Sequence, residues 1–310
     1  MANIDVFVPS TLEEAVAFLA HHGDRAIPIA GGTDVMIDTR IGRISPEWLV
    51  DLRALSGLSG IEYDANGFRI GALTRIRSIE LDQGLRQRST ALVEAARVLG
   101  SVQVRTMATI GGNLCHATPS AEMPPALLVH HGIAEIAGPD GIRSIPLGQL
   151  FVGPGHTSLE PGEILVRVTC KAANPSSASS AGSCYLRQTV RWAMDLAGVG
   201  VAASIEVDEA KVVSGAKLAL SAVAPVPLEV DVVSDMLVGK ELTPQLTKEV
   251  GRVAAEACLP ISDVRGTAEY RRQVVAALVP RALYIAWLRA TQNWPVGKLA
   301  PINGVLSEEE

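Results

Sequence analysis

The spacing of apolar residues along the chain predicts short helices and strands. Between residues 11 and 22, four apolar side chains recur at helical spacing and share one face: Leu12, Ala15, Val16 and Leu19. The T-x-x-E pattern of Thr11 and Glu14 predicts a capped start, and Gly23 predicts the end. We expect further helices at residues 90–100, 244–257 and 267–290, and one capped by Thr74 that runs to about residue 82.

Short apolar runs predict strands at residues 26–30, 48–52 and 164–169. Two turn sequences predict β-hairpins. Asn66-Gly67 separates runs 61–63 and 68–73, and Pro139-Asp140-Gly141 separates runs 133–137 and 142–145. After residue 30 we expect a glycine turn, followed by a short helical turn.

The pattern changes after residues 171–182, "KAANPSSASSAG", which we interpret as a linker or exposed loop. Beyond it, β-rich runs at 196–207 and 212–223 precede the last two helices. Strands followed by helices are typical of an α+β domain with an antiparallel sheet. The tail at 293–310 is expected to be loosely structured and free to dock on something.

Composition excludes several classes of protein. The chain has 310 residues, 48% of them apolar, and a net charge of −6 without a basic run, which argues against nucleic-acid binding. The apolar stretches are too short for a membrane span, and the first residues lack signal-peptide features. The four cysteines form no C-x-x-C, so we expect no zinc or iron–sulfur site and a reduced, cytoplasmic setting.

Two Gly-Gly elements carry the main chemical signal: "IPIAGGTDV" at residues 27–35 and "TIGGN" at 109–113. Glycine lets backbone N–H groups approach a ligand, and successive N–H groups form an anion nest. A helix start nearby adds its positive end. A diphosphate suits this arrangement, whereas two ordinary glycine turns are the plain alternative. Neither the G-x-G-x-x-G of a Rossmann site nor a P-loop is present.

Other polar residues leave alternatives open. Glu122 is placed to accept a hydrogen bond from a ribose hydroxyl or, equally, to act as an acid at a helix start. Arg187, Arg191 and Asp195 are spaced for an anion clamp or for an ion-pair network. Cys115 and His116 are adjacent, and because neighbours on a strand point to opposite faces, we expect a packed thiol and a partly exposed imidazole rather than a catalytic pair.

Four ordered motifs resemble a known family: "AGGTDV", "TIGGN" followed by "ATPSAEMPPALL", "PGEIL", and "YLRQTVRWAMDLAGVGVA". The chain resembles the FAD-binding medium subunits of molybdenum hydroxylases, the carbon monoxide dehydrogenase and xanthine dehydrogenase group. The resemblance implies an α+β fold with a PCMH-type (vanillyl-alcohol-oxidase-like) FAD-binding domain. Its subdomains would span residues 1–55 and 56–176, followed by a C-terminal α+β domain at 177–292 and the tail at 293–310.

The resemblance also implies a set of FAD-binding residues and no catalytic residue or metal ligand in this chain. The set is Pro28, Ile29, Ala30, Gly31, Gly32, Thr33, Asp34, Val35, Leu99, Thr109, Ile110, Gly111, Gly112, Asn113, Thr118, Glu122, Leu165 and Arg187. Glu122 departs from the aspartate usual in the family, which keeps the charge and lengthens the reach. We expect valine at Gly32 or Gly111 to collide with the diphosphate and to release FAD while leaving most of the fold.

By this resemblance the chain acts within a larger assembly. A large subunit with a molybdopterin cofactor would hydroxylate the substrate, and a small subunit with [2Fe–2S] clusters would relay electrons to FAD here and on to an external acceptor. A dimer of heterotrimers is implied. The alternative is a binding module of the same fold that has lost the flavin; a stand-alone flavin oxidase is less favoured. The substrate and the acceptor stay open.

Overall fold

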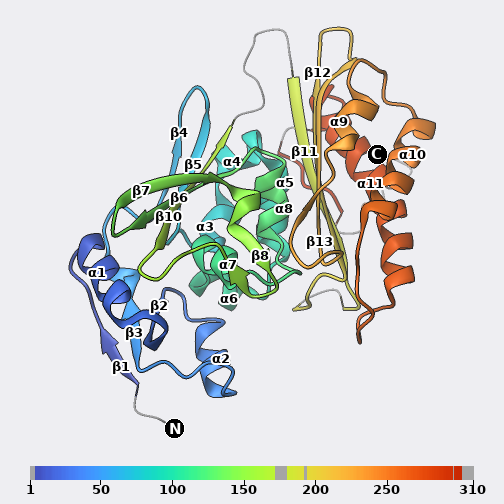
Figure 1. Ribbon diagram of the computed structural model, residues 1–310. Helices are drawn as coiled ribbons and strands as arrows, with labels where there is room; N and C mark the ends of the chain where they lie inside the picture. The colour runs from blue at the N-terminus through green and yellow to red at the C-terminus, as the bar shows by residue number, and fades with distance from the viewer. Residues whose placement is uncertain (1–3, 172–179, 192–193, 296, 302–310) are drawn as a thin grey trace.

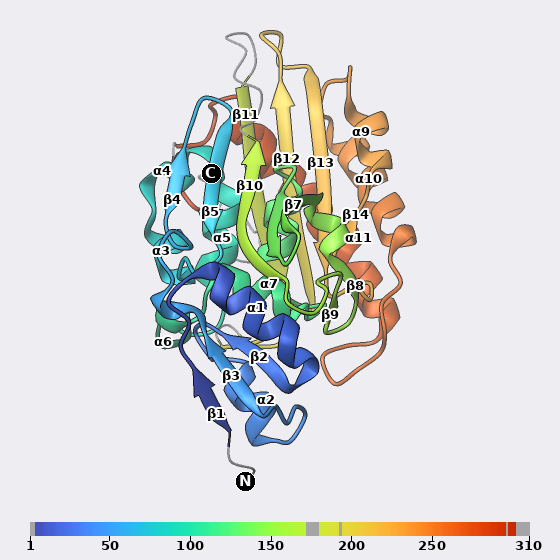
Figure 2. The same cartoon turned by 60° about the vertical axis from the view of Figure 1, so that its left-hand side comes forward.

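The computed structural model describes residues 4–171, 180–191, 194–295 and 297–301. These residues form three main sheets, each covered by helices, and a small hairpin (Figure 1). The first sheet is parallel, with the order β1-β3-β2, and lies at the lower end of the molecule in Figure 2. Its unit contains β1 (Asp5–Phe7), α1 (Leu12–His22), β2 (Ala26–Ile29), α2 (Val35–Arg40) and β3 (Trp48–Asp51).

Helix α1 confirms the pattern read from the sequence. The Thr11 hydroxyl accepts a hydrogen bond from the Glu14 backbone N–H at 3.2 Å, and Ala15, Val16 and Leu19 are buried. Gly23 ends the helix with a φ of +54°. The capping box is only half formed, because the Glu14 carboxylate accepts from the N–H of Ser10 rather than of Thr11.

The second sheet is antiparallel, with the order β4-β5-β10-β6-β7. Its strands are β4 (Ile61–Tyr63), β5 (Gly67–Gly71), β6 (Ile133–Gly138), β7 (Gly141–Pro146) and β10 (Ile164–Lys171). Both hairpins expected from their turn sequences are therefore confirmed. The small hairpin beside this sheet joins β8 (Phe151–Gly153) to β9 (His156–Thr157).

Six short helices accompany the second sheet. They are α3 (Ile76–Leu81), α4 (Gln83–Arg88), α5 (Thr90–Val98), α6 (Val102–Met107), α7 (Ile110–His116) and α8 (Met123–Leu128). Helix α5 is buried nearly all round and packs against both α8 and the third sheet. The six helices thus fill the space between the second and third sheets (Figure 1).

The third sheet is antiparallel in the order β11-β12-β13-β14 and carries the remaining helices. Its elements are β11 (Ser180–Gln188), β12 (Val199–Val207), β13 (Val213–Ser221), β14 (Leu228–Glu229), α9 (Val232–Leu237), α10 (Pro244–Ala257) and α11 (Ala268–Ala290). Side chains alternate across it. Cys184 and Leu186 face the core with α11, whereas Tyr185 faces the core with α5 and α8. The expected α+β class is confirmed.

Two local expectations are wrong. Thr74 caps no helix: its hydroxyl hydrogen-bonds the N–H and the C=O of Gly60, and α3 begins at Ile76. The expected linker is also too long. Ser180 to Gly182 belong to β11, where a Cβ added to Gly182 would overlap the Ala286 carbonyl oxygen. Residues 172–179 of that linker lie outside the described residues.

The first part of the expected tail is packed rather than loose. Trp294 and Ala300 are each 5% exposed, and the Ala300 N–H donates to Glu94 at 2.6 Å. Residues 302–310 of the tail lie outside the described residues. No helix in the described part of the chain is long and apolar enough to cross a membrane.

Candidate functional site

The fold brings the two Gly-Gly elements into direct contact. The first glycine loop, residues 30–34, joins β2 to α2, and the second glycine loop, residues 108–113, joins α6 to the start of α7. A Cβ added to Gly31 would overlap the Met107 carbonyl oxygen and lie 3.0 Å from the Cα of Ala108. Only glycine permits this approach of two backbones. Two segments about 80 residues apart in the chain therefore form one site.

The first glycine loop offers unpaired backbone donors. In the described structure, the N–H groups of Gly31, Gly32, Thr33 and Asp34 donate to no acceptor. Gly32 has a φ of +69°, in the region that favours glycine. Successive N–H groups in such a turn suit an anionic ligand. This loop therefore fits the diphosphate expected from the sequence.

The second glycine loop differs from the expected anion nest, because its N–H groups are already bonded. Ile110 donates to the carbonyl of Thr74 at 3.0 Å and Gly111 to that of Ala72 at 2.8 Å. Gly112 donates to the Thr109 hydroxyl at 3.1 Å, the N-cap bond of α7. What remains free is the open side of Gly112 and the Asn113 Oδ1, which is buried without a partner.

The expected role of Gly111 needs correction. A Cβ at this position would lie 2.8 Å from both the Cβ and the carbonyl oxygen of Ala72, at the end of β5. Its missing side chain therefore lets α7 pack on the second sheet. Valine at Gly111 would disturb this packing before it met any ligand, so Gly112, whose Cβ position meets only the Thr109 hydroxyl at 3.1 Å, is the better probe.

Glu122 and Arg187 form a buried ion pair. Arg187 Nη1 donates to Glu122 Oε1 at 2.8 Å, and the two side chains are 1% and 5% exposed, respectively. Glu122 stands at the start of α8 but its side chain caps no backbone N–H. Burial raises the pKa of Glu122 to about 7, although Arg187 works in the opposite direction. Arg187 Nε is buried without a partner, so the pair retains hydrogen-bonding capacity.

The neighbouring charges form a network rather than a free clamp. Arg187 Nη1 also donates to the Asp195 carbonyl oxygen at 3.1 Å. The Asp195 carboxylate accepts from the Arg191 N–H at 2.8 Å, and this backbone hydrogen bond holds the pKa of Asp195 below its ordinary value. The loop that follows β11 is thereby tied to the buried pair.

The remaining expected residues are spread over several elements. Leu99 ends α5, and its carbonyl oxygen accepts from Arg105 Nη1 at 3.0 Å. Leu165 is buried on β10, against which α7 packs. Thr118 lies half-buried between α7 and α8. Pro28, Ile29 and Ala30 lead along β2 into the first glycine loop, and Val35 begins α2.

One contact near the site was missed by the sequence interpretation. His116 Nε2 lies 3.3 Å from Asp38 Oδ2, joining the end of α7 to α2. His116 and Cys115 lie on a helix and not on a strand, so the reasoning that separated them was wrong. Cys115 is partly buried and packs against the core, and burial raises the pKa of its thiol to about 12. No local pattern links Asp38 to a residue 78 positions away.

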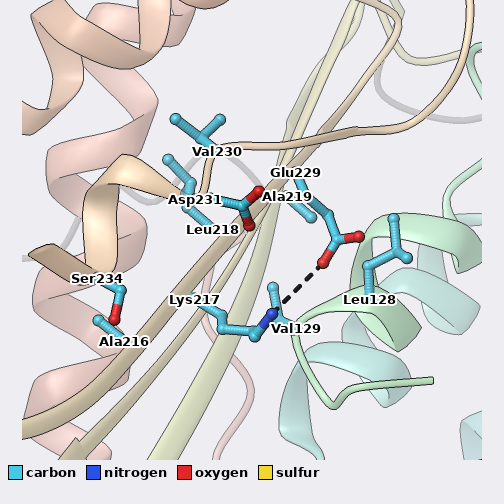
Figure 3. A pocket seen from close by; sticks show the side chains of 10 residues that line it. All are labelled: Leu128, Val129, Ala216, Lys217, Leu218, Ala219, Glu229, Val230, Asp231 and Ser234. Atoms are coloured by element: carbon cyan, nitrogen blue, oxygen red, sulfur yellow. Dashed lines mark ion pairs between the residues drawn. The ribbon is translucent and has the colours of Figure 1, made fainter. Parts of the chain in front are cut away.

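A cavity of about 210 Å³ lies elsewhere, between the end of α8 and the strands β13 and β14 (Figure 3). Its polar lining comes from Lys217, Glu229, Asp231 and Ser234, and Lys217 pairs with Glu229 at 3.5 Å. None of the expected site residues lines it. Within the described residues, no cluster of His, Cys, Asp or Glu side chains is arranged to hold a metal ion.

Two family models match the chain. The model described as "FAD binding domain in molybdopterin dehydrogenase" matches residues 2–170, and "CO dehydrogenase flavoprotein C-terminal domain" matches residues 184–286. Among curated proteins, the chain is 31% identical over 290 residues to the carbon monoxide dehydrogenase medium chain of Hydrogenophaga pseudoflava, covering 93% of this chain and 98% of the relative. It is 29% identical to the glyceraldehyde dehydrogenase medium chain of Sulfolobus acidocaldarius, covering 88% and 94%.

Solved structures agree with these matches. A chain of carbon monoxide dehydrogenase from Hydrogenophaga pseudoflava aligns with a TM-score of 0.88 at 29% identity, covering 93% of this chain and 98% of that chain. Quinoline 2-oxidoreductase from Pseudomonas putida 86 aligns with a TM-score of 0.85 at 27% identity, covering 94% and 98%. The chain therefore carries an FAD-binding domain, and it belongs to the family of FAD-binding medium subunits of molybdenum hydroxylases.

Proposed function

We propose that this chain is the electron-transfer subunit of a heterotrimeric molybdenum hydroxylase. The observation that carries the proposal is the contact between the two glycine loops, with four unpaired N–H groups on the first. A match to the FAD-binding family model over residues 2–170 supports it. Flavin chemistry would supply the exchange of electrons, so the work of this chain is to bind and orient the cofactor.

In this proposal, residues 1–55 and 56–176 form two subdomains that hold FAD between them, and residues 177–292 form the C-terminal domain. The first glycine loop would bind the diphosphate through its N–H groups. Gly112 and the Asn113 amide would border it from α7. Glu122 and Arg187 would supply the charged end of the site. The remaining FAD-binding residues named from the sequence belong to the same proposal.

The partners are inferred from the family. The relatives are medium chains and subunits of complexes, so we propose a large molybdenum subunit with a molybdopterin cofactor and a small subunit with [2Fe–2S] clusters, in a dimer of heterotrimers. Electrons would leave this chain to an external acceptor. All four cysteines are free, which fits a reducing compartment and a cytoplasmic complex.

The first experiment is purification of the chain from its native host, followed by a visible spectrum and a denaturing gel. We expect flavin absorption and two co-purifying chains, one larger and one smaller. A colourless protein without partners would contradict the proposal and favour a binding module of the same fold.

A substitution at Gly112 tests the position of the cofactor. We expect Gly112→Val to weaken FAD binding at least about tenfold, because the new side chain enters the open side of the loop. Titration of the flavin-free chain with FAD, followed by flavin fluorescence, measures the affinity. Ala257→Val, at an exposed position of α10, is the matched control and should leave it unchanged. Unaltered FAD affinity in Gly112→Val would remove the second glycine loop from the site.

A further inference from the structure

Apart from the close approach of the two glycine loops, the N-terminal unit, residues 4–55, is attached to the rest of the molecule by two different contacts. The first is apolar. Helix α1 shares an apolar core with side chains that follow residue 55 in the chain. From α1 this core contains Ala15, Val16 and Leu19, and from the second sheet it contains Ala137 and Ile164. No residue of α2 belongs to this core. Apolar packing is not directional, so this contact alone leaves the orientation of α2 and of the first glycine loop weakly specified.

The second contact is polar and lies beside the glycine loops. Among the described residues, the pair formed by Asp38 and His116 is the only hydrogen bond or ion pair between residues 4–55 and the rest of the chain. The Asp38 side chain is 11% exposed and that of His116 31%, so solvent screens the pair only in part. It is therefore weakened by solvent less than a fully exposed contact of the same kind.

The position of this pair relates it to the site. Asp38 lies on α2, which begins directly after the first glycine loop, and His116 ends α7, which begins within the second. Helices α2 and α7 thus begin at the two glycine loops, which touch each other. Asp38 and His116 join the helices again, about one turn along α2 and about two turns along α7. At the loops themselves, Gly31 meets the Met107 carbonyl in a steric contact without a hydrogen bond. Attraction across the site comes from Asp38 and His116.

We propose that Asp38 and His116 are positioning residues that fix the first glycine loop against the second and so set the affinity for the FAD diphosphate. The proposal rests on the proposed function, since it requires the two loops to bind FAD. Neither side chain has to touch the cofactor. Arg43 also pairs with Asp38, but its side chain is 63% exposed and it belongs to the same unit, so it adds nothing across the site.

The test is a double-mutant cycle with two readouts. Asp38→Ala, His116→Leu and the double variant are compared with the wild type for FAD affinity, by fluorescence titration of the flavin-free full-length chain, and for urea unfolding of that chain without FAD. We expect each single variant to bind FAD about tenfold more weakly, and the double variant to be no worse than either single one. His116→Gln, which keeps a donor, should recover most of the affinity, and Arg43→Ala should retain it.

The outcomes separate this proposal from the proposed function. Failure of the wild type to bind FAD would overturn both. Tight binding by the wild type with additive effects in the cycle would overturn the positioning role alone. A coupling between Asp38 and His116 that appears in unfolding but not in FAD affinity would reduce the pair to a structural contact and would also overturn it.

Discussion

Two buried Glu–Arg pairs cross the contact between the second and third sheets, and they are bonded very differently. Glu94 on α5 accepts four hydrogen bonds, two from Arg289 of α11 and one each from the N–H groups of Tyr185 and Ala300. Glu122 accepts one hydrogen bond from another residue, and Arg187 donates it. Both carboxylates are 5% exposed, so burial alone does not distinguish them.

The difference shows how a buried charge is used. Burial tends to lower the pKa of Arg289, but Glu94 more than offsets this and the pKa of Arg289 is raised. All four hydrogen bonds that Glu94 accepts join separate elements of the fold. Glu122 has too few donors to offset burial, and its pKa rises to about 7. A carboxylate with few partners has hydrogen-bonding capacity left for a ligand.

Removal of the better-bonded carboxylate should have the largest effect. Glu94→Ala leaves the Arg289 guanidinium buried without a counter-charge and two backbone N–H groups without an acceptor. We expect the free energy of unfolding to fall by about 4 kcal/mol, measured by urea denaturation. Glu256→Ala, which removes an exposed partner of Arg252, is the control and should cost less than about 1 kcal/mol. A similarly small loss for Glu94→Ala would mean that the four bonds do not brace the contact.

The contribution of Glu122 to the free energy of unfolding should instead depend on pH. In the unfolded chain the carboxyl loses its proton near pH 4.5, whereas in the folded chain it keeps the proton to about pH 7. Rising pH therefore favours the unfolded state across this window, and stability that is fully present below pH 4.5 is lost as pH rises through 7. The contribution is on the order of 3 kcal/mol.

Glu122→Gln should abolish that slope. The wild type and the variant are unfolded in urea at intervals between pH 4.5 and 8, and the difference between their unfolding free energies isolates the contribution of Glu122. We expect this difference to shift in favour of the variant as pH rises. A constant difference would show that Glu122 is ionised throughout, as a fully bonded carboxylate would be.

The smallest effect is expected from Arg187→Lys. Lysine keeps the charge, but its ammonium lacks the fork with which Arg187 Nη1 reaches both Glu122 and the Asp195 carbonyl. We expect a loss of about 1 kcal/mol in urea unfolding. Arg289→Lys should cost more, because the Arg289 guanidinium also donates to the carbonyls of Ser183 and Lys298. Equal losses at the two arginines would contradict the distinction between the pairs.

The parts of the fold that could be predicted are those fixed by local signals. The Asn66-Gly67 turn, the Thr11 cap and the helix at residues 244–257 depend on residues that lie next to one another. Thr74 shows the limit: its hydroxyl has a partner 14 residues away, and that bond outcompetes the local cap. The sequence that begins at Ser180 resembles a linker, although it forms a strand. Its Gly182 is needed because any side chain there would overlap the Ala286 carbonyl oxygen of α11.

The candidate site shows the same limit of sequence-based prediction. The glycine loops, Glu122 and Arg187 stand out by residue type, and the family resemblance ordered them. Their pairing was not predictable, since Glu122 and Arg187 are 65 residues apart and Asp38 and His116 are 78. The role of Gly111 was misjudged for the same reason, because its neighbour Ala72 is distant in the sequence.

The bonding of Glu94 also sets an order of events during synthesis. Its partners lie 91, 195 and 206 residues further along the chain. While the N-terminal half emerges from the ribosome, this carboxylate has none of them and must remain hydrated. The hydrogen bonds that join Glu94 of α5 to its partners can be completed only after residue 300 has been synthesised. The two glycine loops can therefore meet early, whereas the bonding of Glu94 is complete only after residue 300.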